Sequence, residues 1–520
     1  MRKLWRGDLI NIIHQQARPH TQTGMAELPT VNAPPLNSPL QNSSSPRDLE
    51  PSEGDWEKIR KWQEERIQRK LQGQYESAVL HLSEVLQNNL TTPSQISSVR
   101  VEGAKNTRPS FLKFLIDPLV PPPSHANDLQ QALQSAQKIG SVLRRTDIFE
   151  SVEARLERAE SPFASKYDVD LVFAAKERSR SYFKASTEVG VGNSNEGSAS
   201  VVASLRNVFG GAETFEANLS LGTTTKRAFN ATLTAPVTAD LNTYAQLQCF
   251  STDRDQTAHA SCFEGLRGAK AILRSGFLAG GMHEFAYEGV VRNIGNLKSS
   301  ASLSMREAAG QTIKSSVSHT FTLDSRNDRI MPTDGMYLKT LHEFAGLGGD
   351  ASFAKSETHA QISRPVLPGV SVSFAARSGI LWGLGKPTYF SDRFELGGPT
   401  SIRSFKPNAM GPRDAGDWLG GDTYWSTGIS LISHIPTKAH WPLKSHLWVN
   451  AGRLDNYDKN RSAVENVKDL VTRPAVSVGL GLVYDYNPIR LELNFGLPVA
   501  ASQSDGTRRG LQVGMGLEFL

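Results

Sequence analysis

The sequence predicts an all-β transmembrane barrel of about sixteen antiparallel strands, preceded by a small N-terminal α+β module. Three observations lead to this fold class. From about residue 183 to residue 520, apolar and polar residues alternate in short segments separated by Gly, Asn, Asp, Pro and Ser. The polar face of these segments carries small residues and charges, as a face that lines a wet lumen does. No stretch approaches the roughly 18 consecutive apolar residues of a membrane-spanning helix.

The composition is compatible with this fold and excludes several other classes. The 520 residues include 57 Lys and Arg against 52 Asp and Glu, which gives a net charge of +5. A mean hydropathy of −0.36 fits a barrel, because alternation keeps the average low. So mild a positive charge argues for no nucleic-acid partner. Two cysteines, Cys249 and Cys262, exclude a disulfide scaffold and a multi-cysteine zinc site, and leave open a hairpin disulfide or two packed thiols.

The first 95 residues differ in texture from the rest of the chain. Residues 1–54 are rich in Pro, Ser, Asn and Thr and lack periodicity, so they are predicted to be a disordered tail. Asp8 and Asn11 interrupt the first apolar run, which argues against a secretory signal peptide. A weak organellar presequence and a true start at Met25 both remain open. Residues 55–95 are predicted to be a helical segment, because apolar side chains recur there at helical spacing.

Residues 96–180 show the pattern of a compact α+β module. A short strand is predicted near Val99 and Val101, and Thr107 is placed to cap a helix whose first turn holds Pro109. A second helix with clean helical spacing follows. Two strand patterns then complete the order β-α-α-β-β.

Residues 181–520 are predicted to form the barrel. The alternation is clearest in three late segments: 476–484, 490–495 and 511–519. In a soluble sandwich the apolar face would meet another sheet, whereas in a membrane barrel it meets lipid. The barrel is favoured because the pattern continues without a break that would end a domain, and because charges lie inside otherwise good strands.

The sequence carries no complete signature of a soluble enzyme, and we expect no enzymatic activity, cofactor or metal. His283-Glu284 and His342-Glu343 begin like zinc-protease motifs, but both lack the second histidine. The sequence has no G-x-S-x-G motif and no phosphate-binding glycine loop. Aromatic and basic residues do not interleave as they do in a nucleic-acid platform.

Three segments carry more specific information. The first, LGGPTSIRSF at 396–405, places an arginine inside a glycine-rich loop. An arginine that reaches into a lumen needs an acidic partner or water. The second is the dense turn DSRNDRIMPTDG at 324–335. The third is the C-terminal segment, whose polar-x-Gly-x-x-apolar-x-apolar spacing is formed by Gln512, Gly514, Leu517 and Phe519.

Together these segments resemble the outer-membrane β-barrel insertase family, most closely its mitochondrial branch, the barrel subunits of sorting and assembly machineries. Residues 393–405 are similar to the family's inward loop, and its Arg-Gly-Phe core corresponds here to Arg403, Ser404 and Phe405 after Ile402. Ser404 stands where the family usually has Gly, so a positive φ there would be strained. A second family motif matches four residues: Asp324, Arg326, Pro332 and Gly335. The α+β module resembles a single polypeptide-transport-associated (POTRA) domain.

The resemblance implies insertion of β-barrel precursors through a lateral gate between the first and last strands. Here these would be about 182–192, weakened by Gly190 and Gly192, and 511–520. Arg403 would bond to an acidic group on the lumen wall, for which Asp422 is the candidate by proximity in the motif.

The resemblance also implies a location and partners. The barrel would lie in the mitochondrial outer membrane, with the POTRA domain in the intermembrane space. Its partners would be the lipid bilayer, β-barrel precursors, peripheral subunits on the cytosolic face and intermembrane-space chaperones. A chloroplast-envelope import channel and a passive channel without insertase activity remain the alternatives.

Overall fold

The computed structural model describes residues 56–64, 67–68, 85, 87, 89–122, 128–159, 164–165, 167–189, 197–435, 441–486 and 489–516. The chain divides into two units, Met1–Gln87 and Asn88–Leu520. In the first unit, residues 56–64 are helical. The predicted tail, 1–54, lies outside the described residues. Among the described residues, no helix combines the length and the apolar character needed to cross a membrane.

The second unit begins with an α+β module. Its elements are β1 (Gln95–Glu102), α3 (Pro109–Ile116), the 3-10 turn η2 (Asp117–Leu119), α4 (Leu129–Arg145), β2 (Phe149–Arg158) and β3 (Asp168–Glu177). The three strands are ordered β1-β3-β2, with β1 parallel and β2 antiparallel to β3. Apolar side chains of both helices cover the sheet, and the core is formed by Leu115, Ile139, Leu143, Leu171 and Phe173.

The start of α3 differs from the expectation. Its N-cap position is Arg108, whose side chain makes no capping hydrogen bond, with Pro109 following in the first turn. The hydroxyl of Thr107 instead donates to Glu177 Oε1 at 2.7 Å. The cap prediction was wrong: the helix begins one residue later, and the Thr107 hydroxyl oxygen accepts from Asn207 Nδ2 at 2.9 Å and not from a helix amide.

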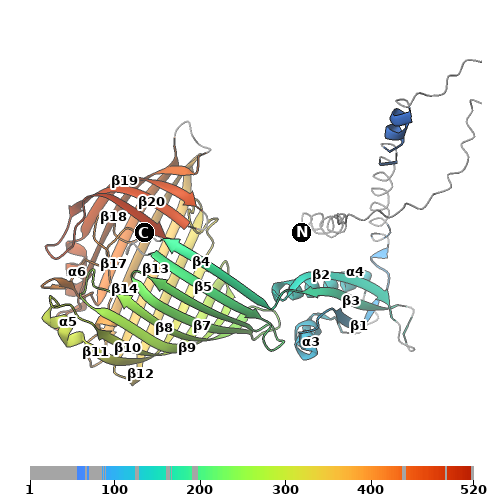
Figure 1. The fold of residues 1–520 in the computed structure, drawn as a ribbon, viewed down its shortest axis with the longest axis horizontal. Coiled ribbons are helices and arrows are strands. Elements are labelled where there is room, and N and C mark those ends of the chain that lie inside the picture. The colour runs from blue at the N-terminus through green and yellow to red at the C-terminus, as the bar shows by residue number, and fades with distance from the viewer. Residues whose placement is uncertain are drawn as a thin grey trace, which may run out of the picture. The chain divides into compact units, whose positions relative to one another are not determined.

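Sixteen strands form one antiparallel sheet that follows the module, as predicted. The strands are β4 (Ser181–Val189), β5 (Gly197–Arg206), β6 (Thr214–Gly222), β7 (Thr225–Pro236), β8 (Thr243–Asp255), β9 (Phe263–Phe277), β10 (Gly281–Gly295), β11 (Gly310–Asp324), β12 (Gly335–Gly349), β13 (Phe353–Leu367), β14 (Val370–Gly383), β17 (Thr423–His434), β18 (Leu443–Asp455), β19 (Ala475–Tyr486), β20 (Ile489–Ala500) and β21 (Gly510–Gly516). Each pairs with its neighbour in chain order, from β4 at one end to β21 at the other. Figure 1 shows the sheet curled around an interior.

Alternation gives the curled sheet an apolar outer face and a polar inner face. In β18, Leu447 and Val449 are exposed. The residues that alternate with them are buried: His446, Trp448 and Asn450. The outward set would meet lipid in a membrane. The period of two in the sequence therefore predicts the orientation of these side chains correctly.

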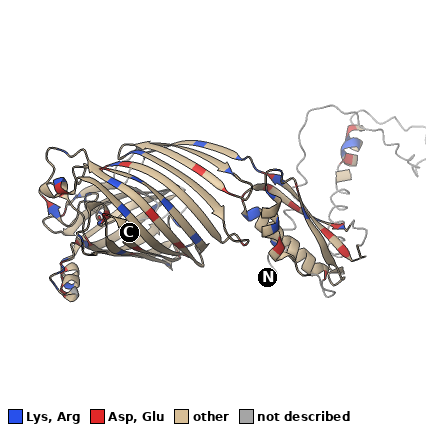
Figure 2. Ribbon diagram, turned by 90° about the horizontal axis from the view of Figure 1, so that it is seen from below, with Lys and Arg blue, Asp and Glu red and all other residues tan. Residues whose placement is uncertain are grey.

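Ion pairs connect neighbouring strands on the inner face. Lys314 of β11 lies 3.0 Å from Glu288 of β10 and 2.8 Å from Glu343 of β12. Arg274 of β9 pairs with Glu284 of β10 at 2.8 Å. Figure 2 shows charged residues along several strands of the sheet. Charges inside alternating strands are thus paired across the ladder.

Two turns of the large sheet contact the module. Leu241, between β7 and β8, is buried with the module's core, and Arg145 donates to Asn242 Oδ1 at 3.0 Å. In the turn between β5 and β6, Glu213 pairs with Arg108 at 2.7 Å. The module and the sheet therefore share apolar and ionic contacts.

Candidate functional site

The connection between β14 and β17, residues 384–422, lies on the inner face of the sheet, and we call it the luminal loop. It contains η3 (Phe390–Asp392) and a small hairpin, β15 (Arg413–Asp414) with β16 (Asp417–Trp418). Its residues contact β10, β18, β20 and β21. β10 lies far from the other three in the strand order, so a single connection reaches all four only across the concave side of the curled sheet.

A glycine-rich turn brings the central residues of the luminal loop together. Gly397 and Gly398 have φ values of 109° and 114°. A Cβ on Gly397 would lie 2.7 Å from the carbonyl oxygen of Lys406. The Gly398 amide donates to the Ile402 carbonyl at 3.1 Å and closes the turn. Ile402 is buried against β18, where a Cβ on Gly452 would meet its Cδ1 at 2.5 Å. This turn presents Arg403 to the wall.

Arg403 is the centre of the site. Its side chain and that of Glu492 on β20 are both 0% exposed and form a bidentate ion pair. Nε donates to Oε2 at 3.0 Å, and Nη2 donates to Oε2 at 2.9 Å and to Oε1 at 3.2 Å. Nη1 donates to Asn450 Oδ1 of β18 at 3.2 Å. The planar fork of arginine fits this arrangement and ties the loop to two strands.

The partners of Glu492 extend the cluster along the wall. Arg490, two residues earlier on the same face of β20, also pairs with Glu492. Asn494 Nδ2 donates to Glu492 Oε2 at 2.7 Å and its Oδ1 accepts from the Trp448 indole at 3.0 Å. The Trp448 ring lies 5.4 Å from the Arg403 guanidinium carbon. Glu492 is thus the carboxylate that both guanidiniums of this cluster share.

Ser404 and Phe405 connect the loop to the last strand. Ser404 has φ 69°, the left-handed conformation in which a non-glycine residue is strained, and is fully buried. Its amide donates to Gln512 Oε1 of β21 at 2.8 Å. Phe405, also fully buried, bridges to Thr507 in the connection before β21. The sequence argument that a positive φ here would strain serine therefore applies.

Asp422 is not the partner of Arg403, contrary to the prediction. Its Oδ1 accepts from the Thr388 hydroxyl at 2.8 Å and lies 3.9 Å from Arg393. Asp422 stands at the base of the luminal loop, directly before β17, whereas Arg403 lies against β18 and β20 farther along the inner face. Glu492 was detectable in part, because the alternation of 490–495 places it on the polar face. Its pairing with Arg403, which lies 89 positions earlier in the sequence, was not detectable.

The luminal loop also docks through a second buried ion pair and through α5 (Leu303–Ala308). Arg292 of β10 pairs with Asp392 at 2.6 Å, both nearly fully buried. Ser304 donates its amide and hydroxyl to Asp414 at 3.0 and 2.8 Å. These hydrogen bonds lower the pKa of the Asp414 carboxyl. The loop is thus fixed at several points along its length.

The turn between β11 and β12, with the residues that flank it, holds the four residues of the second predicted motif. Arg326 binds both carboxylate oxygens of Asp324 at 2.9 Å and donates to Gln361 at 2.8 Å. Gly335 has φ 112°, and a Cβ there would lie 2.5 Å from the Ser325 carbonyl oxygen. Met331 packs against side chains of β17 and β19, and Pro332 lines a small pocket with Arg490 of β20. This turn therefore also folds over the inner face.

The predicted gate residues are described in part. Gln512 and Gly514 lie in β21, and the Gln512 side chain binds the luminal loop as above. Four predicted gate residues lie outside the described residues: Gly190, Gly192, Leu517 and Phe519. Cys249 and Cys262 are free thiols, so they form no hairpin disulfide, and of the two thiols predicted to be packed only Cys262 is buried.

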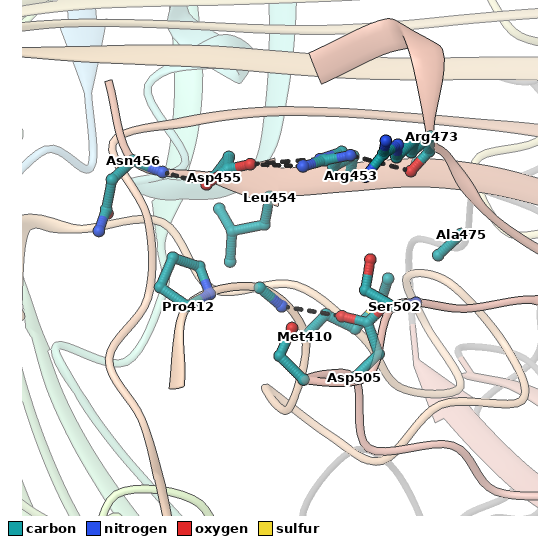
Figure 3. Close-up of a pocket in the computed structure, with 13 residues that line it drawn as sticks. Met410, Pro412, Arg453, Leu454, Asp455, Asn456, Arg473, Ala475, Ser502 and Asp505 are labelled. Atoms are coloured by element: carbon teal, nitrogen blue, oxygen red, sulfur yellow. Dashed lines mark hydrogen bonds and ion pairs between the residues drawn. The ribbon is translucent and has the colours of Figure 1, made fainter. Parts of the chain in front are cut away.

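A polar cavity of about 300 Å³ lies where the luminal loop meets the ends of β18 and of the β20–β21 connection (Figure 3). Arg453 pairs with Asp455 at 2.7 Å along one side. Asp505 accepts from the Gly411 amide at 3.0 Å on the other. Among the described residues, no group of three His, Cys, Asp or Glu side chains is placed to hold a metal ion.

Comparisons with known proteins agree with this architecture. The Omp85 superfamily domain model matches residues 207–519. A SAM50-like protein of Schizosaccharomyces pombe is 36% identical over 448 residues, covering 84% of this chain and 94% of its own. The sorting and assembly machinery component 50 homolog of Xenopus tropicalis is 31% identical over 433 residues, covering 82% and 90%. BamA from Haemophilus ducreyi, in a structure lacking POTRA domains 1–3, has a TM-score of 0.69 at 18% identity and covers 81% of this chain and 84% of that chain. This last likeness concerns the fold.

Proposed function

Because the chain belongs to the Omp85 superfamily, and within it to the SAM50 barrel subunits, we propose that it inserts β-barrel precursor proteins into the mitochondrial outer membrane. The activity is non-enzymatic, since the work is the pairing of strands and the transfer of apolar surface into lipid. The α+β module is a POTRA domain in the intermembrane space. Peripheral cytosolic-face subunits and intermembrane-space chaperones are its further partners.

The observation that carries this proposal is the strand order. β4 and β21 stand at the two ends of a sixteen-strand hydrogen-bonded sheet. An end strand offers a row of amide and carbonyl groups to a further strand. A precursor's last strand can add to such an edge, with backbone hydrogen bonds supplying affinity and alternate side chains supplying specificity. The seam between β4 and β21 is therefore the proposed lateral gate.

The luminal loop has a defined part in this proposal. Ser404 and Arg403 attach it to the last two strands, β21 and β20. When the gate opens at the seam, β4 separates from β21. The luminal loop meanwhile keeps its contact with β21 on the inner face. The buried ion pair between Arg403 and Glu492 supports this role. Its bidentate, charge-assisted hydrogen bonds resist movement of the loop along β20.

The test is import into mitochondria depleted of this protein. Two labelled precursors are compared, an outer-membrane β-barrel protein and a matrix protein with a presequence. The proposal predicts that barrel assembly fails while matrix import continues. Normal assembly of both, with a loss of ion conductance, would support a passive channel. Loss of matrix import with normal barrel assembly would support an import channel instead.

A further inference from the structure

Helix α6 (Ala463–Thr472), in the connection between β18 and β19, carries an exposed apolar stripe. It begins with a complete capping box between Ser462 and Glu465, so its start is well defined. Val464, Val467 and Val471 recur at i, i+3 and i+7 and are 77, 58 and 57% exposed. The opposite face is polar and holds Asp469, which pairs with Arg461 at 2.8 Å. An exposed apolar face of this kind on an amphipathic helix is typical of a surface that contacts lipid or another protein.

The C-terminal end of α6 is fixed to the outer face of the sheet. Trp425 lies between the buried, inward-facing Tyr424 and Ser426 of β17, so it points outward. Its indole N–H donates to the Leu470 carbonyl at 3.0 Å. Arg453 of β18, opposite Trp425 in the ladder, donates to the Arg473 carbonyl at 3.3 Å. The side chains of Trp425 and Arg453 thus donate hydrogen bonds to backbone carbonyl groups at the C-terminal end of α6, which lack partners within the helix.

Aromatic residues mark the same rim of the sheet. Trp382, on the outward face near the end of β14, packs against Tyr457 with ring centroids 4.8 Å apart. Lys459 donates to the Gly383 carbonyl at 3.0 Å. The connection therefore leans outward over β14, β17 and β18, and Figure 1 shows α6 at the edge of the sheet. Trp and Tyr gather on barrels where the apolar band meets the lipid headgroups.

We propose that α6 is an interfacial anchor, with its valine stripe inserted into the headgroup–acyl boundary of the bilayer beside β17 and β18. Lipid is the occupant because the stripe continues the outward apolar band of the wall through Trp425 and Trp382. Lys468 lies at the flank of the stripe, where its stem can follow the apolar surface while its ammonium reaches the headgroups. The anchor fixes the level of the bilayer at these strands. It concerns membrane contact and stands apart from the insertase proposal.

The test places a polarity-sensitive fluorophore on either face of α6. Cysteine replaces Val467 in one full-length variant and Asp469 in a matched control, both in a chain carrying Cys249→Ser and Cys262→Ser. Both positions are exposed in the protein, Val467 to 58% as a whole residue and Asp469 to 58% in its side chain, and neither packs in a core. Both variants are reconstituted into vesicles of phosphatidylcholine and phosphatidylethanolamine, with or without brominated phosphatidylcholine.

The proposal predicts a blue-shifted probe at 467 that loses roughly half of its emission to brominated lipid, and a water-exposed probe at 469 that iodide quenches. Equal iodide quenching at both positions, without lipid quenching, would overturn it. A blue-shifted probe at 467 that neither quencher reaches would also overturn it, because a protein surface would then cover the stripe. A Val471→Cys probe repeats the measurement one turn later and should follow 467.

Discussion

Replacing Glu492 by Gln should destabilise the protein more than replacing Arg403 by Ala, although Gln keeps almost the shape of Glu. Glu492 pairs with two guanidiniums, those of Arg403 and Arg490. Arg403→Ala leaves Glu492 paired with Arg490. Glu492→Gln removes the carboxylate that both guanidiniums share. The ranking follows from charge and not from the volume removed.

The size of the effect can be worked from the contacts. One ion pair at about 4 Å between charge centres contributes about 4 kcal/mol at an effective dielectric constant near 20. Arg403→Ala loses one such pair and its fork of hydrogen bonds, and we expect a cost of about 3 kcal/mol after relaxation. Glu492→Gln loses two attractions, while the repulsion between the two guanidiniums that was already present stays, so we expect about 5 kcal/mol. Arg403→Lys keeps the charge but loses the fork, and should cost less than either.

The assay is equilibrium unfolding of the full chain in lipid vesicles, followed by tryptophan fluorescence and by the gel mobility of folded and unfolded forms. Trp448, which contacts this cluster, makes the fluorescence sensitive to it. A smaller cost for Glu492→Gln than for Arg403→Ala would refute the reasoning. So would costs below about 1 kcal/mol for both, the value of solvent-exposed pairs.

Three further predictions concern single positions. Ser404→Gly should stabilise the fold by about 1 kcal/mol in the same unfolding assay, because it relieves a positive φ and removes a buried hydroxyl without a partner among the described residues; a loss of stability would contradict this. Gly335→Ala should cost about 2 kcal/mol or more, since its Cβ meets the Ser325 carbonyl at a positive φ, and an unchanged midpoint would exclude that clash. Burial, with a smaller contribution from Glu264, raises the pKa of the Cys262 thiol to about 12, so little reactive thiolate forms near neutral pH. Maleimide should therefore modify Cys262 only after denaturation, and rapid labelling of the folded chain, read by mass spectrometry, would oppose this.

Much of the barrel was predictable because it depends on a local pattern. Alternation with period two assigns each side chain to a face, and it places Arg490, Glu492 and Asn494 on the polar face of one strand. Register across distant strands has no such local signal. Asp422 follows Arg403 closely in the sequence, yet the luminal loop places the arginine on Glu492 of β20, three strands from β17.

Other differences have equally physical causes. Thr107 is a residue type that often caps helices, but here the helix begins one residue later and Asn207 donates to the Thr107 hydroxyl oxygen. Helix α6 was not predicted, since ten residues between two strands give too little periodicity beside the strong strand pattern. Its capping box, Ser462 with Glu465, was the signal that could have revealed it.

The most direct test of the central claim is a cross-link between the first strand and an arriving precursor. Ala185→Cys lies on the outward face of β4, and Ala231→Cys on the outward face of β7 is the matched control within the sheet, both with Cys249→Ser and Cys262→Ser. A labelled precursor with a single cysteine in its last strand is added under mild oxidation. The account predicts a disulfide adduct at 185, none at 231, and loss of the adduct when the precursor's last strand is deleted. A precursor that assembles normally without any adduct at 185, or with equal adducts at both positions, would contradict insertion at the β4 edge.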